Sequence, residues 1–128
     1  MTRLPTLYVV DHVAVSVSDF ARSRAFYEAA LAPLGFRLMY EQEGMAGFGA
    51  EDRDDFGITE REPVTSAVHV AFAAPSRDAV DAFYEAALAS GGRDNGPPGL
   101  RPQYHAGYYS AFVYDPDGNN VEAVFHDR

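Results

Sequence analysis

The chain has 128 residues, a formal net charge of −9 and no cysteine, and its apolar content of 47% is that of one ordinary globular domain. Since no thiol is present, disulfides, thiolate nucleophiles and thiolate zinc sites are excluded, and a metal ion would need His, Asp or Glu ligands. The acidic balance argues against a nucleic acid or a membrane as partner, because anionic surfaces are bound mainly through Lys and Arg.

The chain opens with a predicted strand whose two faces differ in chemistry. Residues 8–17 are rich in β-branched side chains, and alternation directs His12 and Ala14 to one face. The opposite face, expected to pack under a helix, carries Val13, Val15 and Val17. This strand therefore pairs a core face with a face that is free to carry a site.

A helix and three extended runs complete the first half. Ser18 or Asp19 is the expected N-cap, helical spacing of apolar residues continues to Leu34, and Gly35 ends the helix. Extended runs follow at residues 36–42, 45–50 and 56–60, with an acidic turn at residues 51–55. The first half therefore reads β-α-β-β-β.

The second half repeats the first at an offset of 57 residues. Residues 12–35 align without gaps on residues 69–92, with 12 of 24 pairs identical and His12 matching His69. A weak extended run near Arg93 and a Gly- and Pro-rich loop over residues 95–103 come next. Two strands follow, residues 108–114 and 121–126, joined by the turn-forming sequence DPDGNN.

Alternation places three metal-binding side chains, His12, His69 and Glu122, on the strand faces that point away from the helices. Two imidazoles and one carboxylate suit Zn, Mn, Ni or Fe(II) and leave coordination positions open for water or substrate. Either histidine alone is more simply a hydrogen-bonded structural residue. The repeat favours a metal site over this structural interpretation, because equivalent histidines become neighbours if the two copies pack about a pseudo-twofold axis.

The duplicated His-Val-Ala start, the AFYEAAL helix and the segment DPDGNNVEAVF resemble the vicinal oxygen chelate superfamily over residues 7–127. That superfamily includes glyoxalases, extradiol dioxygenases, fosfomycin-resistance enzymes and bleomycin-binding proteins. The resemblance implies one α+β domain, residues 1–128, of two tandem βαβββ modules, residues 7–62 and 63–127, which form a cup-shaped mixed β-sheet with the helices on the outside. It also implies one divalent metal ion in the cup, Fe, Zn, Mn or Ni, held by His12, His69 and Glu122.

One position departs from the superfamily pattern. The fourth metal ligand falls near Gly57 or Ile58, whose side chains bind no metal, and Glu60 is a poor substitute. This counts against the four-ligand glyoxalase design and resembles the His-His-Glu sets of extradiol dioxygenases and fosfomycin-modifying enzymes. However, Ala14 stands where the fosfomycin enzymes usually carry threonine, and the chain has few cationic groups for a phosphonate beyond Arg101.

The resemblance therefore implies a metal-dependent enzyme, either a lyase or isomerase or an extradiol-type oxidoreductase, whose ion chelates and polarises an oxygen-bearing small molecule. Two alternatives stay open: a metal-free drug-binding module of the bleomycin-resistance type, and a fosfomycin-type thiol transferase. A homodimer is expected, and the cup closes either within one chain or between two. We expect a soluble cytoplasmic protein, because no apolar run approaches a membrane span and the first residues lack a signal-peptide pattern.

The segment PPGLRPQYHAGYY, residues 97–109, is also rich in side chains that can bind a ligand, with one Arg, one His and three Tyr. It suits a rim that binds an aromatic or anionic small molecule, or equally a rigid loop whose tyrosines cover the sheet. Within it, Tyr109 and His105 are the candidates for proton transfer. The candidate substrate-binding residues are Arg101, Tyr104, Phe48, Phe112 and Tyr114.

Overall fold

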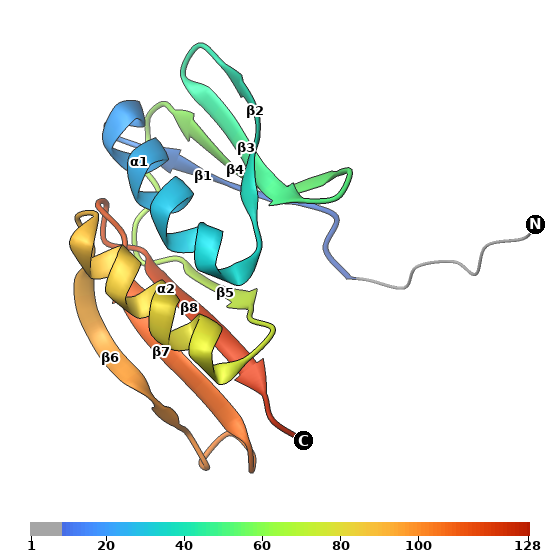
Figure 1. Ribbon diagram of the computed structural model, residues 1–128. Helices are drawn as coiled ribbons and strands as arrows, with labels where there is room; N and C mark the ends of the chain where they lie inside the picture. The colour runs from blue at the N-terminus through green and yellow to red at the C-terminus, as the bar shows by residue number, and fades with distance from the viewer. Residues whose placement is uncertain (1–8) are drawn as a thin grey trace, which may run out of the picture.

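The computed structural model describes residues 9–128 and confirms the α+β fold of two βαβββ modules (Figure 1). The first module contains β1 (Val13–Val17), α1 (Phe20–Leu31), the 3-10 helix η1 (Ala32–Leu34), β2 (Arg37–Gln42), β3 (Met45–Ala50) and β4 (Arg53–Glu60). The second contains β5 (His69–Ala73), α2 (Arg77–Ala89), β6 (Arg93–Leu100), β7 (Tyr108–Tyr114) and β8 (Asn120–His126). The division of the chain after residue 62 stays a prediction.

Each module forms its own four-stranded mixed sheet. The strand orders are β1-β4-β3-β2 and β5-β8-β7-β6, and in each sheet the first strand runs parallel to the last strand of its module. Within residues 9–128 no strand of one sheet is paired with a strand of the other. Both β1 and β5 are therefore edge strands.

Side-chain caps begin both helices, as the sequence predicts. Of the two residues proposed to cap α1, Asp19 is the cap, since its carboxylate accepts a hydrogen bond from the backbone N–H of Arg22 at 3.1 Å. Ser18 instead donates to Asp117, in the turn between β7 and β8. Ser76 caps α2 by accepting from the N–H of Ala79 at 3.1 Å.

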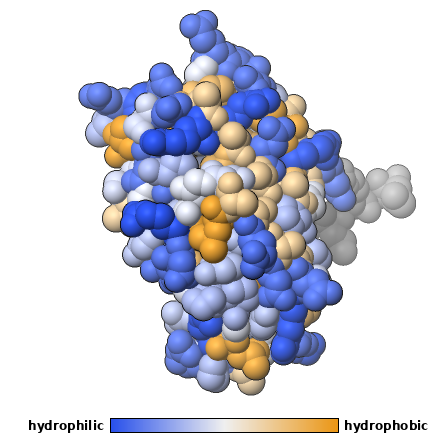
Figure 2. All heavy atoms as spheres, turned by 60° about the vertical axis from the view of Figure 1, so that its left-hand side comes forward, coloured by the Kyte–Doolittle hydropathy of each residue, from blue (hydrophilic) through white to orange (hydrophobic). Residues whose placement is uncertain are grey.

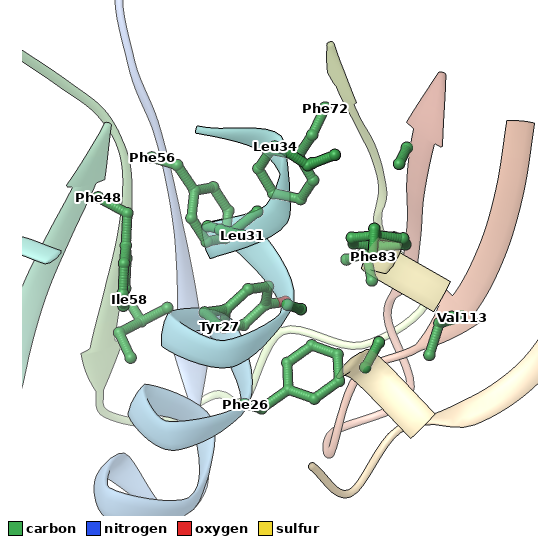
Figure 3. Close-up of a cluster of buried hydrophobic side chains, with 14 of the residues drawn as sticks. Phe26, Tyr27, Leu31, Leu34, Phe48, Phe56, Ile58, Phe72, Phe83 and Val113 are labelled. Carbon is green, nitrogen blue, oxygen red and sulfur yellow. The ribbon is translucent and has the colours of Figure 1, made fainter. Parts of the chain in front are cut away.

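One hydrophobic core joins the two modules. Figure 3 shows Phe26, Tyr27 and Leu31 of α1 lying between the strands of the first module and the helix and strands of the second. Phe56 of β4 and Phe72 of β5 meet edge to face, with ring centroids 5.0 Å apart. The helices pack against each other and leave one face of each sheet outside this core.

Two segments differ from the sequence prediction. The expected loop over residues 95–103 begins as part of β6, and β4 starts at Arg53 inside the expected acidic turn. Gly and Pro are tolerated in β6 because it is an edge strand, and its register against β7 shifts on both sides of Gly96. Val13, expected to pack under α1, is 36% exposed.

Polar side chains are frequent on the face of the molecule that Figure 2 shows. In the face shown in Figure 2, strongly hydrophobic residues form separate small spots among hydrophilic ones. Along residues 9–128, neither helix has the length and apolar content that a membrane-spanning segment needs.

Candidate functional site

The site centres on Glu122, a buried carboxylate on β8. Its side chain is 1% exposed, and its Oε1 lies 2.7 Å from Nε2 of His69 on β5, whose side chain is 53% exposed. The two strands are parallel neighbours with Ala71 beside Glu122, so both side chains project from one sheet face. The chain has no Lys, and no Arg among residues 9–128 forms an ion pair with Glu122. A buried carboxylate without such a partner is a natural position for a cation.

The donor atoms of this pair fit a divalent ion. His69 Nε2 and Glu122 Oε1 form a hydrogen bond of 2.7 Å, whereas ligands bonded at 2.0–2.1 Å stand about 2.9 Å apart at right angles and about 3.3 Å apart in a tetrahedral site, so a small displacement lets both atoms bind one ion. Imidazole and carboxylate are also the donor types that Zn, Mn, Ni and Fe(II) accept. In the part of the chain that the structure describes, however, no three His, Asp or Glu residues come together as a metal site. The pair therefore lacks a third ligand within one chain.

Tyr108 holds the other oxygen of the carboxylate. Its hydroxyl donates to Oε2 of Glu122 at 2.5 Å. Desolvation raises the pKa of Tyr108 above its ordinary value, and the hydrogen bond to Glu122 raises it further, so the phenol stays a proton donor. Both oxygens of Glu122 thus have a partner, one imidazole and one phenol.

A histidine pair borders the Tyr108 ring. Nδ1 of His105 lies 2.8 Å from the carbonyl oxygen of Ala106, and its Nε2 lies 2.9 Å from Nδ1 of His126. Because a carbonyl only accepts, His105 carries its proton on Nδ1, and in the neutral pair His126 donates to His105. His105 therefore belongs to the surroundings of Tyr108, and its hydrogen bonds go to Ala106 and His126.

Three of the predicted substrate-binding residues lie around this site. Phe112 stands opposite Glu122 in the β7–β8 register, with its ring centroid 6.1 Å from that of His69. The guanidinium of Arg101 lies 5.5 Å from the Phe112 centroid and donates to the carbonyl of Pro97. Tyr104, 57% exposed, packs on Tyr108 with ring centroids 4.9 Å apart.

His12 lies apart from His69 within one chain. Its side chain is 70% exposed, and Nδ1 lies 2.8 Å from Oδ1 of Asp11. It lines a pocket of about 500 Å³ on the first module, together with Ala14 and Gly57. His69 lines a different pocket, of about 580 Å³, beside β5. Asp11 and Val13, on either side of His12, line this second pocket as well. Among residues 9–128, however, His12 does not join His69 and Glu122 in one metal-binding group.

The strand registers identify the first-module counterpart of Glu122. Ala14 of β1 pairs with Gly57 of β4, as the repeat-equivalent Ala71 of β5 pairs with Glu122 of β8. Gly57 thus stands where a fourth ligand would project, and it has no side chain. An added Cβ there would meet Ala46 O at 3.4 Å and Ala14 Cβ at 3.7 Å, which are ordinary contacts, so the position accepts a small side chain.

The other two residues near that position serve the fold. Ile58 is 1% exposed and belongs to the core. Glu60 accepts a hydrogen bond from the backbone N–H of Phe20 at 2.7 Å, at the start of α1. Neither contributes to a metal site in this chain.

Phe48 belongs to the hydrophobic core and also lines the pocket beside β5 that His69 lines. It is fully buried between Tyr27 and Phe56, with ring centroids 6.2 and 6.4 Å away. The register of β3 shifts against both of its neighbours near this residue, so simple alternation is an unsafe guide to its direction. Tyr114 lies at the far end of β7, under the guanidinium of Arg93.

Tyr109 also faces the helix side. Its hydroxyl donates to Asp81 of α2 at 2.6 Å, Arg77 lies over its ring, and the hydrogen bond to Asp81 raises its pKa. The tyrosine that reaches the site is its neighbour Tyr108, which sequence reasoning missed. Alternation back from Phe112 contained the signal, because even-numbered residues of this strand share the face of Glu122.

Comparison with known proteins agrees with this architecture. The family model described as Glyoxalase/Bleomycin resistance protein/Dioxygenase superfamily matches residues 9–123. A solved glyoxalase/bleomycin resistance protein from Albidiferax ferrireducens T118 is 34% identical, with a TM-score of 0.79, over 90% of this chain and 96% of that chain. A family enzyme from Burkholderia phytofirmans PsJN is 21% identical, with a TM-score of 0.71, over 91% of this chain and 97% of that chain.

A variant of glyoxalase I from Zea mays is 27% identical, with a TM-score of 0.68, over 90% of this chain but 45% of that chain. In the search of curated proteins nothing matches this chain. The family model spans most of the sequence, and the Albidiferax protein is identical to this chain at about a third of the aligned positions. The chain therefore belongs to the glyoxalase/bleomycin resistance protein/dioxygenase superfamily, which is the vicinal oxygen chelate superfamily.

Proposed function

We propose that this protein is a metal-dependent enzyme in which His69 and Glu122 of one chain, with His12 of a second copy, hold one divalent ion. The observation that carries the proposal is the buried carboxylate of Glu122, whose Oε1 lies 2.7 Å from the exposed imidazole of His69. These two donors have the chemistry of metal ligands and lie close enough for both to bind one ion after a small displacement. A metal with several open positions would then bind an oxygen-bearing small molecule.

A second copy supplies the third ligand in this proposal. The support is that β1 and β5 are both edge strands and that His12 and His69 line separate pockets. Edge strands with exposed apolar side chains favour association, and Val10 and Val13 beside His12 are both exposed. A homodimer in which β1 of one chain approaches β5 of the other closes the cup and covers these valines.

When bound, the ion supplies Lewis-acid polarisation of a substrate oxygen. The protein side chains orient the substrate: Gly57 and Ala14 leave room beside His12, and Phe112 offers an aromatic surface beside His69. Arg101, over Phe112, favours a negatively charged group on that substrate. The choice between isomerase, lyase and dioxygenase chemistry is a question for substrate screening.

Metal loading of protein without a His-tag tests the proposal. We expect about one equivalent of divalent metal per chain, and a fall in affinity of more than about 100-fold in His69→Ala and Glu122→Gln, because each removes a direct ligand. Glu60→Gln is the matched control, since it makes the same chemical change on a carboxylate that accepts only from the backbone N–H of Phe20. Less than about a tenth of an equivalent, after loading with excess Zn, Mn, Ni and Fe(II), contradicts the proposal.

Ligand binding separates the proposal from its main alternative. A metal-free drug-binding module binds its aromatic ligand equally well with a chelator present and in His69→Ala. The proposed metal enzyme loses ligand affinity in both cases. Isothermal calorimetry with and without a chelator measures the difference.

A further inference from the structure

We propose that Tyr108 is a positioning residue that holds one oxygen of Glu122 and presents only the other to the metal. This inference rests on the proposed metal-binding function. It concerns the orientation of the carboxylate, which the identity of the three ligands leaves open.

The two oxygens of Glu122 have different partners. Oε2 accepts from the Tyr108 hydroxyl at 2.5 Å, and Oε1 lies 2.7 Å from Nε2 of His69. Only the second oxygen therefore lies beside a predicted ligand. A carboxylate with one oxygen engaged by a phenol binds an ion through its remaining oxygen, and its torsion angles are restricted.

The Tyr108 side chain is itself held in place. Its ring meets those of His105 and His126 edge to face, each with centroids 5.3 Å apart, and that of Tyr104 at 4.9 Å. The hydrogen bond between the two histidines, at 2.9 Å, links the β6–β7 connection to the end of β8. Ring contacts on several sides limit the rotamers of Tyr108, so its hydroxyl stays directed at Glu122.

The site is also deep enough for this hydrogen bond to matter. Glu122 is 1% exposed, and Ser110, between Tyr108 and Phe112 on the same strand face, is fully buried. Water therefore has little access to Glu122 and cannot easily replace the hydrogen bond that the Tyr108 hydroxyl donates. Removal of the hydroxyl leaves Oε2 with an unsatisfied lone pair and free to turn toward the metal.

Tyr108→Phe tests the proposal, and Tyr109→Phe is a closely matched control. The two variants lose the same atom from adjacent tyrosines, but the Tyr109 hydroxyl binds Asp81 on the helix side. We expect Tyr108→Phe to lower the affinity for Co²⁺ by about 10–100-fold and to change the visible absorption of the Co²⁺-saturated protein. Tyr109→Phe should leave both the affinity and the spectrum as in the wild type.

A second measurement needs no tyrosine variant. In the wild-type protein, the infrared bands of the Glu122 carboxylate, assigned by difference from Glu122→Gln, should move apart on Zn²⁺ loading, as one-oxygen ligation requires. Bands that move together, as in two-oxygen ligation, overturn the proposal even if Tyr108→Phe fails to fold.

The outcomes distinguish this proposal from the one on which it rests. If the wild type binds no Co²⁺, both fail. If the wild type binds Co²⁺ and Glu122→Gln does not, but Tyr108→Phe keeps the wild-type affinity and spectrum, the metal site stands and the role of Tyr108 is overturned. A Tyr108→Phe protein that only melts at a lower temperature likewise overturns it.

Discussion

At the scale of single residues, a buried polar cluster connects the two modules. Tyr27 of α1 donates to Oδ2 of Asp115 at 2.5 Å, and Asp115 also accepts from the side-chain amide and the backbone N–H of Asn119. Asp115 and Asn119 are both almost fully buried, in the turn between β7 and β8. The DPDGNN segment thus stabilises the contact of that turn with α1 in addition to forming a hairpin.

Tyr27→Phe should lower the free energy of unfolding by about 1–3 kcal/mol, because a buried carboxylate loses a hydrogen bond that water cannot replace. Urea unfolding of the variant and the wild type at neutral pH measures the difference. Tyr84→Phe is a suitable control, since Tyr84 is the repeat-equivalent residue and donates to the exposed Asp94. An equal loss in both variants would contradict the special role of the Tyr27 cluster.

The stability difference between the wild type and Tyr27→Phe should depend on pH. Desolvation, with the nearby Asp115 carboxylate, raises the pKa of Tyr27 well above 10.0 in the folded state. Above about pH 10 the unfolded chain loses a proton that the folded chain retains, so this stabilisation is complete below that pH and declines as the pH rises. The stability difference between wild type and Tyr27→Phe should therefore shrink between about pH 8 and about pH 10.5 in urea titrations. A difference that stays constant or grows would show that the sign is wrong.

At the scale of elements, the junction of α2 and β6 is closely packed. A Cβ added at Gly92 would lie 2.6 Å from Val113 Cγ1, 2.8 Å from Phe26 Cε1 and 2.9 Å from the backbone oxygen of Ala87. Helices α1 and α2 and strand β7 therefore meet at a position where only glycine fits.

Gly92→Ala should destabilise the protein by about 1–3 kcal/mol, because the backbone oxygen cannot move aside cheaply. Gly57→Ala is the matched control, since its Cβ would make ordinary contacts, and we expect unchanged or slightly higher stability. Thermal unfolding of the two variants provides the comparison. Equal melting temperatures would mean that the junction relaxes more easily than its contacts indicate.

At the scale of the whole molecule, the proposed site needs two chains. Its ligands are divided between a first module with His12 and a second module with His69 and Glu122. A symmetric dimer that exchanges modules contains two such sites, each with ligands from both chains.

Mixing two variants that each bind metal weakly tests whether the site is shared between two chains. His12→Ala and Glu122→Gln should each bind metal weakly, whereas an equimolar mixture refolded together should regain about a quarter of the wild-type sites, because half of the random dimers contain one intact site. A mixture of His69→Ala and Glu122→Gln is the control, since both changes fall in the same module. If the cup closes within one chain, neither mixture recovers metal binding.

The sequence predicted the elements well where a local signal exists. The repeat predicted two equivalent modules, and alternation placed His69 and Glu122 on one face. The sequence narrowed the cap of α1 to Ser18 or Asp19, of which the structure shows Asp19, and Ser76 caps α2 as predicted. Alternation was a poor guide near β3, where the register shifts and the Phe48 side chain packs in the core. Tyr109 was chosen as a candidate from the tyrosine-rich segment, whereas the structure directs Tyr108 to Glu122 and Tyr109 to Asp81.

The amino-acid sequence by itself determined the family, the two-module fold and the chemical types of the candidate ligands, because these follow from local periodicity, the internal repeat and motif residues. Only the tertiary structure decided which side chains meet. It separated His12 from His69 and joined Tyr108 to Glu122, and it showed that Gly57 occupies the counterpart position of Glu122. Such contacts depend on how two sheets and two helices pack, which is set by the combined side chains of distant segments and not by the pattern of any one strand.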